Sequence, residues 1–378
     1  MSSDSIPLFL FGNGLSMALS PEFSLKKITQ TFINSLEGNE KDFLEQLCGG
    51  ADKINFDDFE ENFSKLEDAY NSLLRYNGFL KSNVGTNFLN HFNLPNPDLD
   101  KHEEIIKSIY HKYIFQILGI IRNKVTKQGI QDKLPSFTAF LRVMLSNIKG
   151  YVFTLNYDLL AEAIMLEEIG TKNITDFCSK TGFFKGTEIF KYDFDPAMNE
   201  DKFGTGFMND VVELHHLHGS LSLFYDHSRN KAIKFCNEDI FTNDIYNSIF
   251  EYRWPLCPAI ITGGGKSLKM NEYPFEFYFR RFKELTTYGK FNKLFIVGYS
   301  FRDEHVNDLI KRWIKTVEDY ASGLLIVDFR STPNEMILFK KQVKKCLHLQ
   351  KPIPDKCFEF GGANAIHDIL GTITKIED

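Results

Sequence analysis

His218, which stands directly before Gly219, is the residue whose type and setting most clearly suggest chemistry. An imidazole titrates near neutral pH, so at the end of a strand it can accept a proton. His216 would share a strand face with it, but no cysteine pair or carboxylate with the spacing of a metal site accompanies them. We therefore expect no metal. A structural histidine bonded to the backbone is the alternative for His218.

A second candidate is the glycine-rich turn Gly12-Asn13-Gly14-Leu15-Ser16. Glycines let a backbone approach a pyrophosphate, and the N-terminus of a following helix supplies N–H donors. The third glycine of the dinucleotide-binding fingerprint is missing, because position 17 is Met. The turn suits a phosphate group, and a bare tight turn is the alternative.

Both candidates belong to a wider pattern, in which apolar runs end in glycine or small polar residues. The runs occupy residues 6–11, 150–155, 211–217, 294–298 and 323–328, and the residues at their ends include Gly12, Asn156, Asp158, His218, Gly298, Ser300, Asp303 and Asp328. In an open parallel sheet, ligands bind beyond the carboxyl ends of the strands. Each residue also has a structural interpretation: turn formers at 156, 158 and 328, and helix caps at 300 and 303.

The elements that must position these residues are strands, and the runs at 294–298 and 323–328 are continuously apolar, as is typical of strands covered on both faces. Helical patterns at 159–168, 275–287 and 305–320 lie between them, and a further strand is expected at 257–262. This alternation predicts an α/β fold with a Rossmann-like, doubly wound parallel sheet. We expect residues 168–210 to form an irregular excursion over that sheet.

Residues 25–148 instead carry a helical apolar pattern. We therefore predict an α/β domain of residues 1–24 and 149–378 and a helical insertion domain of residues 25–148. Around 105–121 the expected helix is apolar on nearly all sides, so other helices or another subunit must cover it.

The composition excludes several classes of protein. Hydrophobic residues make up 43% of the 378 residues and charged residues 25%, which excludes a disordered or fibrous chain. A formal charge of −6 argues against broad nucleic-acid binding. No apolar run is long enough to span a bilayer, and we expect no secretory signal. The six cysteines are scattered without CxxC pairs, which favours reduced thiols in the cytoplasm.

Taken together, these segments resemble the sirtuin (silent information regulator) superfamily. Its motifs GAGxS, TQNID, HG and GxS are similar, in the same order, to Gly12-Asn13-Gly14-Leu15-Ser16, Thr154-Leu155-Asn156-Tyr157-Asp158, His218-Gly219 and Gly298-Tyr299-Ser300. The segment Pro21-Glu22-Phe23-Ser24 is a distant likeness of PDFR and lacks its arginine.

Three departures distinguish the chain from the family's deacylases. It lacks their four-cysteine zinc module, it has Leu155 in place of their glutamine, and Asn156 and His218 are much further apart. These departures indicate a subgroup. The phrases Thr-Leu-Asn-Tyr-Asp (154–158), Leu-His-Gly-Ser (217–220) and Gly-Tyr-Ser-Phe-Arg-Asp (298–303) are similar to bacterial sirtuin-like proteins of antiphage defence. The resemblance implies an NAD glycohydrolase that depletes NAD during infection. It also implies a homo-oligomer, with a HerA-type hexameric ATPase as a candidate partner and nucleic acid engaged only through such a partner.

The same resemblance implies roles for individual residues. Asn156 would position water and the ribose hydroxyls, His218 would accept a proton, and Asp158 would hold the carboxamide. The remaining NAD-binding residues would be Gly12, Asn13, Gly14 and Ser16 at the pyrophosphate, with Phe23, Gly298, Ser300, Asp303 and Asp328 elsewhere on the nucleotide. Two other functions stay open: a sirtuin-type deacylase or ADP-ribosyltransferase, and a non-catalytic NAD-sensing scaffold that regulates a partner ATPase.

Overall fold

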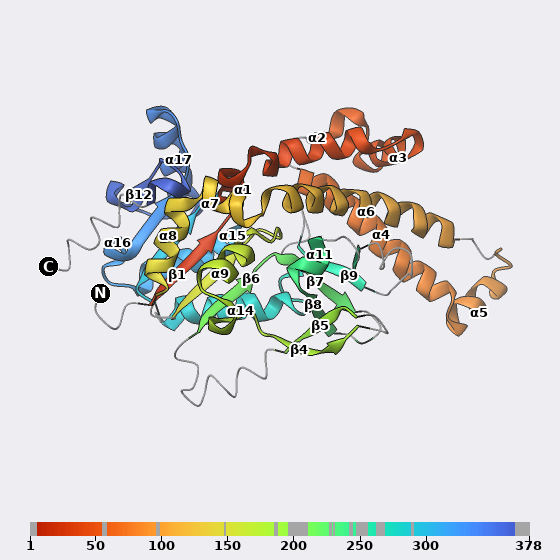
Figure 1. Ribbon diagram of the computed structural model, residues 1–378. Helices are drawn as coiled ribbons and strands as arrows, with labels where there is room; N and C mark the ends of the chain where they lie inside the picture. Colours follow the sequence, from red (N-terminus) through yellow and green to blue (C-terminus); the bar gives the residue numbers. More distant parts are fainter. Residues whose placement is uncertain are drawn as a thin grey trace. The chain divides into compact units, whose positions relative to one another are not determined.

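A computed structural model of the chain describes residues 6–54, 59–95, 99–146, 149–184, 188–195, 211–226, 229, 231–241, 245–246, 256–261, 269–288 and 291–366 (Figure 1). The chain divides into two compact units. The first, called the sheet unit here, comprises residues 1–21, 120–261 and 267–378. The second, the helical unit, comprises residues 22–119 and 262–266. The helical unit thus ends at 119, whereas the expected insertion runs to 148.

A parallel sheet of seven strands forms the centre of the sheet unit. Its order is β12-β11-β10-β1-β2-β6-β3, and every neighbouring pair is parallel. The strands are β1 (Pro7–Phe11), β2 (Gly150–Thr154), β3 (Ile174–Thr175), β6 (Val212–His216), β10 (Lys293–Val297), β11 (Leu324–Val327) and β12 (Phe358–Glu359). The Rossmann-like α/β fold predicted from the apolar runs is confirmed. β1 has β2 on one side and β10 on the other, so the strand order reverses at β1, where such sheets bind their ligands.

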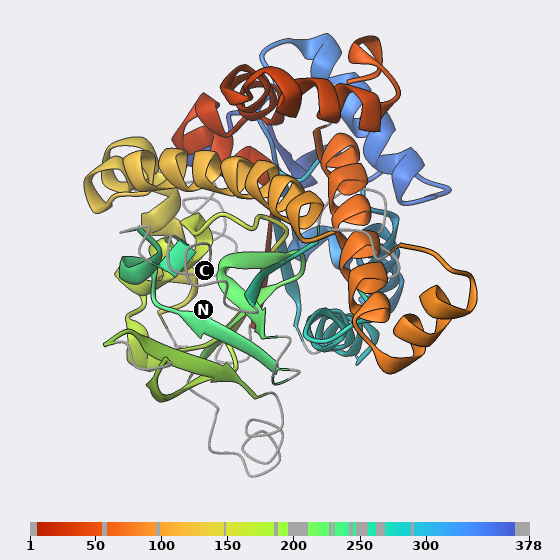
Figure 2. The same cartoon turned by 90° about the vertical axis from the view of Figure 1, so that its right-hand side faces the viewer.

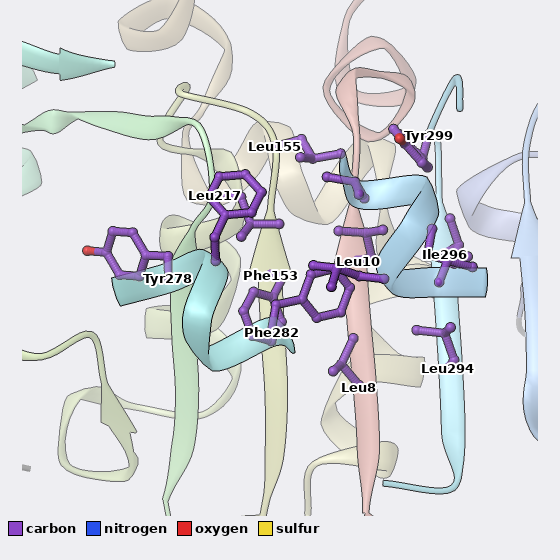
Figure 3. Packing of buried hydrophobic residues seen from close by; sticks show 14 of the residues in the cluster. Leu8, Leu10, Phe153, Leu155, Leu217, Tyr278, Phe282, Leu294, Ile296 and Tyr299 are labelled. Atoms are coloured by element: carbon purple, nitrogen blue, oxygen red, sulfur yellow. The ribbon is translucent and has the colours of Figure 1, made fainter. Parts of the chain in front are cut away.

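Helices cover both faces of this sheet, which explains the continuous apolar runs. Leu8 and Leu10 pack on the face that carries α14 (Phe275–Tyr288) and α15 (Glu304–Thr316), where Phe282 joins the same core (Figure 3). Side chains alternate along a strand, so Phe9 and Phe11 point to the opposite face. There their rings meet Phe140 and Phe137 of α8 (Pro135–Met144) at 6.1 and 5.6 Å between centroids.

A second, antiparallel sheet of five strands also belongs to the sheet unit, in the order β4-β5-β8-β7-β9. Its strands lie together in both views (Figure 1, Figure 2) and are β4 (Cys178–Phe183), β5 (Phe190–Phe194), β7 (Gly219–Asp226), β8 (Lys231–Phe235) and β9 (Leu256–Ile260). The expectation of an irregular excursion over residues 168–210 is therefore wrong for the described part, which forms β3, β4 and β5. Residues 196–210, and the end of the strand expected at 257–262, lie outside the described residues.

Six further α-helices described in the sheet unit lie between these elements along the chain. They are α1 (Asn13–Leu19), α7 (Lys127–Lys133), α9 (Leu160–Glu168), α11 (Asn237–Phe241), α16 (Tyr320–Gly323) and α17 (Pro333–Cys346). Thr332 caps α17 in a capping box with Glu335, and Pro333 at its first position suits the start of a helix.

The helical unit contains α2 (Leu25–Ser35), α3 (Gly38–Cys48), α4 (Phe59–Leu80), α5 (Asn83–His91) and most of α6 (Leu99–Lys124). The apolar groups of α6 are mostly buried within a single chain, among them Ile109, Tyr113 and Ile117, so α6 itself does not call for another subunit. By contrast, Phe88 and Phe92 of the α4–α5 hairpin are 41% and 56% exposed. No helix in the described ranges is long and apolar enough to cross a membrane.

Candidate functional site

Three glycines at the ends of β1 and β10 bring two loops into direct backbone contact. The N–H of Gly12 donates to the carbonyl of Val297 at 2.9 Å, and that of Gly14 to the carbonyl of Gly298 at 2.8 Å. A Cβ on Gly14 would lie 2.6 Å from the Cα of Gly298, which itself has a φ of +66°. These glycines are therefore required because the two backbones touch each other. Their grip on a pyrophosphate stays a prediction.

Asn156, just beyond β2, is held by hydrogen bonds to the Gly12–Ser16 segment that follows β1. Its Nδ2 donates to the carbonyl oxygen of Gly12 at 3.1 Å and to the Oγ of Ser16 at 3.0 Å. Both amide hydrogens are thereby used, which fixes the plane of the amide and turns Oδ1 away from these acceptors. The side chain is buried, with 7% of the residue exposed. Among the described residues, no donor meets Oδ1.

Ser16 and Asp158 continue this chain of hydrogen bonds. Ser16 Oγ donates to Asp158 Oδ2 at 2.5 Å, and the N–H of Leu160 at the start of α9 donates to Asp158 Oδ1 at 3.0 Å. Burial raises the pKa of Asp158, while these two hydrogen bonds act in the opposite direction. Since Ser16 is fully buried and both carboxylate oxygens are engaged, the structure shows these residues as supports of Asn156. Their predicted contacts with phosphate and carboxamide stay predictions.

His218 lies where the chain leaves the parallel sheet for the antiparallel one. Its carbonyl oxygen accepts from the N–H of Ile261 at 2.8 Å. Gly219 has a φ of +81°, and a Cβ there would lie 1.9 Å from the carbonyl oxygen of Ala259. Only glycine fits this close approach, so backbone packing explains why glycine follows His218. The predicted position of His218 at a strand end is thus observed.

The imidazole of His218 pairs with Asp303, with 2.9 Å between Nε2 and Oδ2. Asp303 also caps α15, because its Oδ1 accepts from the N–H groups of His305 at 3.1 Å and Val306 at 3.3 Å. The helix-cap interpretation of Asp303 therefore holds, and Asp303 also contacts His218, which the sequence did not predict. A role of Asp303 in binding the nucleotide stays a prediction.

Asn156 and His218 occupy equivalent places on neighbouring strands. Thr154 and His216 are partners in the register of β2 and β6, and each candidate lies two residues beyond one of them. The N–H of Leu217 donates to the carbonyl of Thr154 at 2.9 Å, which continues the pairing toward the site. The fold therefore places two residues that are distant in the chain at corresponding positions beyond neighbouring strands.

The other predicted residues lie further from this pair in the sheet order or in the other unit. Ser300 is exposed after β10, and Asp328 after β11 pairs with Arg330 at 2.7 Å, although burial raises the pKa of Asp328. Asn13 opens α1. Phe23 is buried in the helical unit, so its assignment to the site stays a prediction.

A buried charge cluster near the site was not foreseen. Lys234 Nζ lies 2.6 Å from Glu162 Oε1 and also contacts Asp176. Burial raises the pKa of Glu162; it would also raise that of Asp176, but the charge of Lys234 lowers it. The one available signal was Lys234 itself, a charged residue in the otherwise apolar run Ala232–Phe235.

His216 borders this charge cluster and contacts different groups from His218. Its Nε2 lies 4.0 Å from Glu162 Oε2, and neither ring nitrogen has a hydrogen-bond partner in the part of the chain that the structure describes. Burial, together with the charge of Lys234, lowers the pKa of His216 to about 3. No group of three or more histidine, cysteine or acidic residues within the described ranges could hold a metal ion.

Comparison with known proteins places the chain in a family. The SIR2-like domain matches residues 150–346, which is more than half of the chain. A solved structure of a mutant Sir2 homologue in complex with 2'-O-acetyl ADP ribose is similar over 99% of this chain and 94% of that chain, with 12% identity and a TM-score of 0.40. No curated protein matches the chain. The matched range includes Asn156, His218 and Asp303, and the chain belongs to the SIR2-like family of NAD-dependent enzymes.

Proposed function

We propose that this protein is an NAD⁺ glycohydrolase that cleaves NAD⁺ with water to nicotinamide and ADP-ribose. One observation carries the proposal: Asn156 and His218 lie two residues beyond paired residues of β2 and β6, at the carboxyl end of the parallel sheet. That edge is where parallel α/β sheets bind nucleotides. The Gly12–Ser16 turn follows β1, the strand that pairs with β2.

The reaction requires little of the protein beyond positioning and one proton acceptor. The bond between ribose C1′ and the nicotinamide nitrogen breaks, its electron pair stays on the ring, and nicotinamide leaves as a neutral molecule. The ribose passes through an oxocarbenium-like state, as in other glycoside hydrolyses. Water adds at C1′, and its proton passes to a base, for which we propose His218. Asn156 Oδ1, turned away from its own partners, can accept a hydrogen bond from the water or from a ribose hydroxyl.

Protein deacylation is the rival within the family. Leu155 stands where the deacylases carry glutamine, and none of the six cysteines forms a closely spaced pair. A non-catalytic NAD-binding scaffold is the second rival. The defined hydrogen bonds of Asn156 and His218 favour an active site over a scaffold, because each side chain is held in one orientation.

In the cell, we propose a cytoplasmic role in antiphage defence through depletion of NAD, within a homo-oligomer or a complex with a HerA-type ATPase. The sequence resemblance supports this assignment. The α4–α5 hairpin adds a surface suited to assembly, since its aromatic rings contact one another while staying partly exposed. These are Tyr76, Phe79, Phe88 and Phe92.

The test is to incubate the purified chain with NAD⁺, alone and with the products of neighbouring genes, and to quantify nicotinamide and ADP-ribose. We expect the two in equal amounts without any peptide. A parallel reaction contains an acyl-lysine peptide. Nicotinamide release that depends on the peptide would establish the deacylase instead, and tight NAD⁺ binding without nicotinamide release would establish the scaffold.

A further inference from the structure

We propose that Asp303 is a positioning residue that sets the tautomer of His218, so that the lone pair of the neutral imidazole lies on Nδ1. This inference rests on the proposed function for its consequence, the transfer of a proton to His218. The geometry that carries it is independent of the substrate: it consists of one carboxylate, one imidazole and the start of α15.

The two oxygens of Asp303 have different tasks. Oδ1 accepts from the N–H groups of His305 and Val306 at the start of α15, which leaves Oδ2 facing His218 Nε2 at 2.9 Å. An ionised carboxylate can only accept, so the proton in this contact belongs to Nε2. A neutral imidazole carries one N–H, and Nδ1 is therefore the nitrogen that can accept a proton. Among the described residues, Asp303 is the one side-chain partner of His218.

Asp303 is itself held in place by the loop around it. Tyr299 Oη donates to the backbone carbonyl of Asp303 at 3.0 Å and contacts Asn307 Oδ1 at 2.9 Å. Asn307 Nδ2 donates to the carbonyl of Phe301 at 3.0 Å, which secures the turn where Phe301 adopts a φ of +57°. Asp303 is 9% exposed, so its carboxylate cannot rotate freely toward solvent. Its orientation toward His218 is therefore a property of the loop.

Two substitutions separate this role from helix capping. Asn and Ser both cap helices well, so Asp303→Asn and Asp303→Ser should each preserve the start of α15. In Asp303→Asn, the single oxygen caps the helix and the NH₂ group faces His218. Nε2 must then accept, and the proton moves to Nδ1. In Asp303→Ser, the shorter side chain caps the helix but no longer reaches the ring, and neither tautomer is imposed.

We expect Asp303→Asn to lower kcat for NAD⁺ cleavage about 1,000-fold, because the wrong tautomer is enforced, and Asp303→Ser to lower it about 10- to 100-fold. Because the positioning role acts through His218 and needs no contact with the nucleotide, KM should stay within about threefold of the wild type in both, whereas a raised KM would indicate the nucleotide-binding role instead. We therefore predict a lower kcat for Asp303→Asn than for Asp303→Ser. Similarity in shape to Asp would predict the opposite order, because Asn resembles Asp more closely than Ser does. Equal, near-normal kcat in two folded variants, or a raised KM with normal kcat, would overturn the proposal.

The tautomer itself can be read without any turnover. Long-range ¹H–¹⁵N spectra of protein labelled in histidine, in mildly alkaline buffer, distinguish Nε2–H from Nδ1–H, and the spectrum of His218→Ala identifies the signal. We expect Nε2–H in the wild type and Nδ1–H in Asp303→Asn. An unchanged tautomer in that variant would refute the positioning role even if the protein cleaves NAD⁺. The predicted change in a protein that does not cleave NAD⁺ would uphold it while the proposed function fails.

Discussion

Two buried polar clusters lie side by side in the sheet unit and are built in different ways. The strand-end cluster consists of Asn156, Ser16 and Asp158 with the His218–Asp303 pair. The charge cluster consists of Lys234, Glu162 and Asp176, with His216 beside it. They share elements: Asp158 and Glu162 lie on either side of the start of α9, and His216 and His218 on either side of the end of β6.

The difference between the clusters lies in which atoms of their hydrogen-bonded side chains have protein partners, apart from His216, whose two ring nitrogens have none among the described residues. In the strand-end cluster, hydrogen bonds orient Asn156 and His218. Among the described residues, Asn156 Oδ1 and His218 Nδ1 have no partner. In the charge cluster, Lys234 instead joins α9, which carries Glu162, to Asp176, just before β4. We infer that the first cluster acts on a ligand and that the second fastens α9 to the antiparallel sheet.

Removing the charge of Lys234 should have the largest effect of all the variants, and this effect should be on stability. Lys234→Met leaves Glu162 and Asp176 buried without their partner, so the free energy of unfolding should fall by about 3–5 kcal/mol. Chemical denaturation measures this. The matched control, Glu162→Gln with Lys234→Met and Asp176→Asn, removes all three charges and should recover much of the loss. A single variant as stable as the wild type would show that the cluster does not fasten the fold.

Next in size, Asn156→Ala and His218→Ala should each reduce NAD⁺ cleavage at least about 100-fold, or about 2.7 kcal/mol in the barrier. Both side chains are buried and hydrogen-bonded, so each variant should also lose about 1–3 kcal/mol of unfolding free energy, less than Lys234→Met. Steady-state nicotinamide release measures the loss. Near-normal turnover in a well-folded variant would remove that residue from the site.

His216 should make stability depend on pH. Its pKa of about 3 in the folded protein lies below the value of about 6.5 expected in the unfolded chain, so the unfolded state binds the proton more tightly. The contribution of His216 to the stability is complete when the pH is above its pKa in the unfolded chain. It is lost as the pH falls toward its pKa in the folded protein. Between pH 7 and pH 5 it amounts to about 2 kcal/mol.

His216→Phe should remove this share of the pH dependence. The comparison is the change in unfolding free energy between the two pH values, wild type against variant. The raised pKa values of Asp158 and Glu162 act in the opposite direction in both proteins and cancel in this difference. Identical pH profiles would show that His216 does not resist protonation.

The smallest effect should come from Asp328, which lies two strands away from β1. Asp328→Asn should raise KM for NAD⁺ several-fold with kcat unchanged, because one hydrogen bond to the nucleotide contributes about 1 kcal/mol. Initial rates over a range of NAD⁺ concentrations measure it. A lower kcat with unchanged KM would place Asp328 in the chemistry, contrary to its pairing with Arg330.

Five strands of the parallel sheet were predictable, because burial on both faces leaves apolar runs such as Leu8–Phe11. The two-residue strands β3 and β12 were not predicted. Nor was the antiparallel sheet predicted. β4 reads Cys-Ser-Lys-Thr-Gly-Phe, and β8 places Lys234 inward because Glu162 and Asp176 neutralise it. A pattern based on hydrophobicity cannot foresee a buried cation whose partners lie 72 and 58 positions away.

For the site, the residue types were predictable and their partners were not. Strand ends identified Asn156 and His218, since parallel strands place their carboxyl ends on one edge. The bond between His218 and Asp303 joins residues 85 positions apart, and no local spacing encodes it. Gly14 shows the same limit of sequence-based prediction. The glycine-rich sequence indicates that a side chain is excluded at this position, but not that the backbone of Gly298 excludes it.

The most direct test of the division between the two clusters measures nicotinamide release and the unfolding midpoint on the same samples of wild type, His218→Ala and Lys234→Met. The assay is run at a temperature at which all three are folded. We predict that His218→Ala loses turnover with a smaller fall in its midpoint than Lys234→Met, whereas Lys234→Met loses more stability and keeps turnover within about threefold of the wild type. Full turnover in His218→Ala, with turnover abolished in folded Lys234→Met, would contradict the account and place the chemistry in the charge cluster.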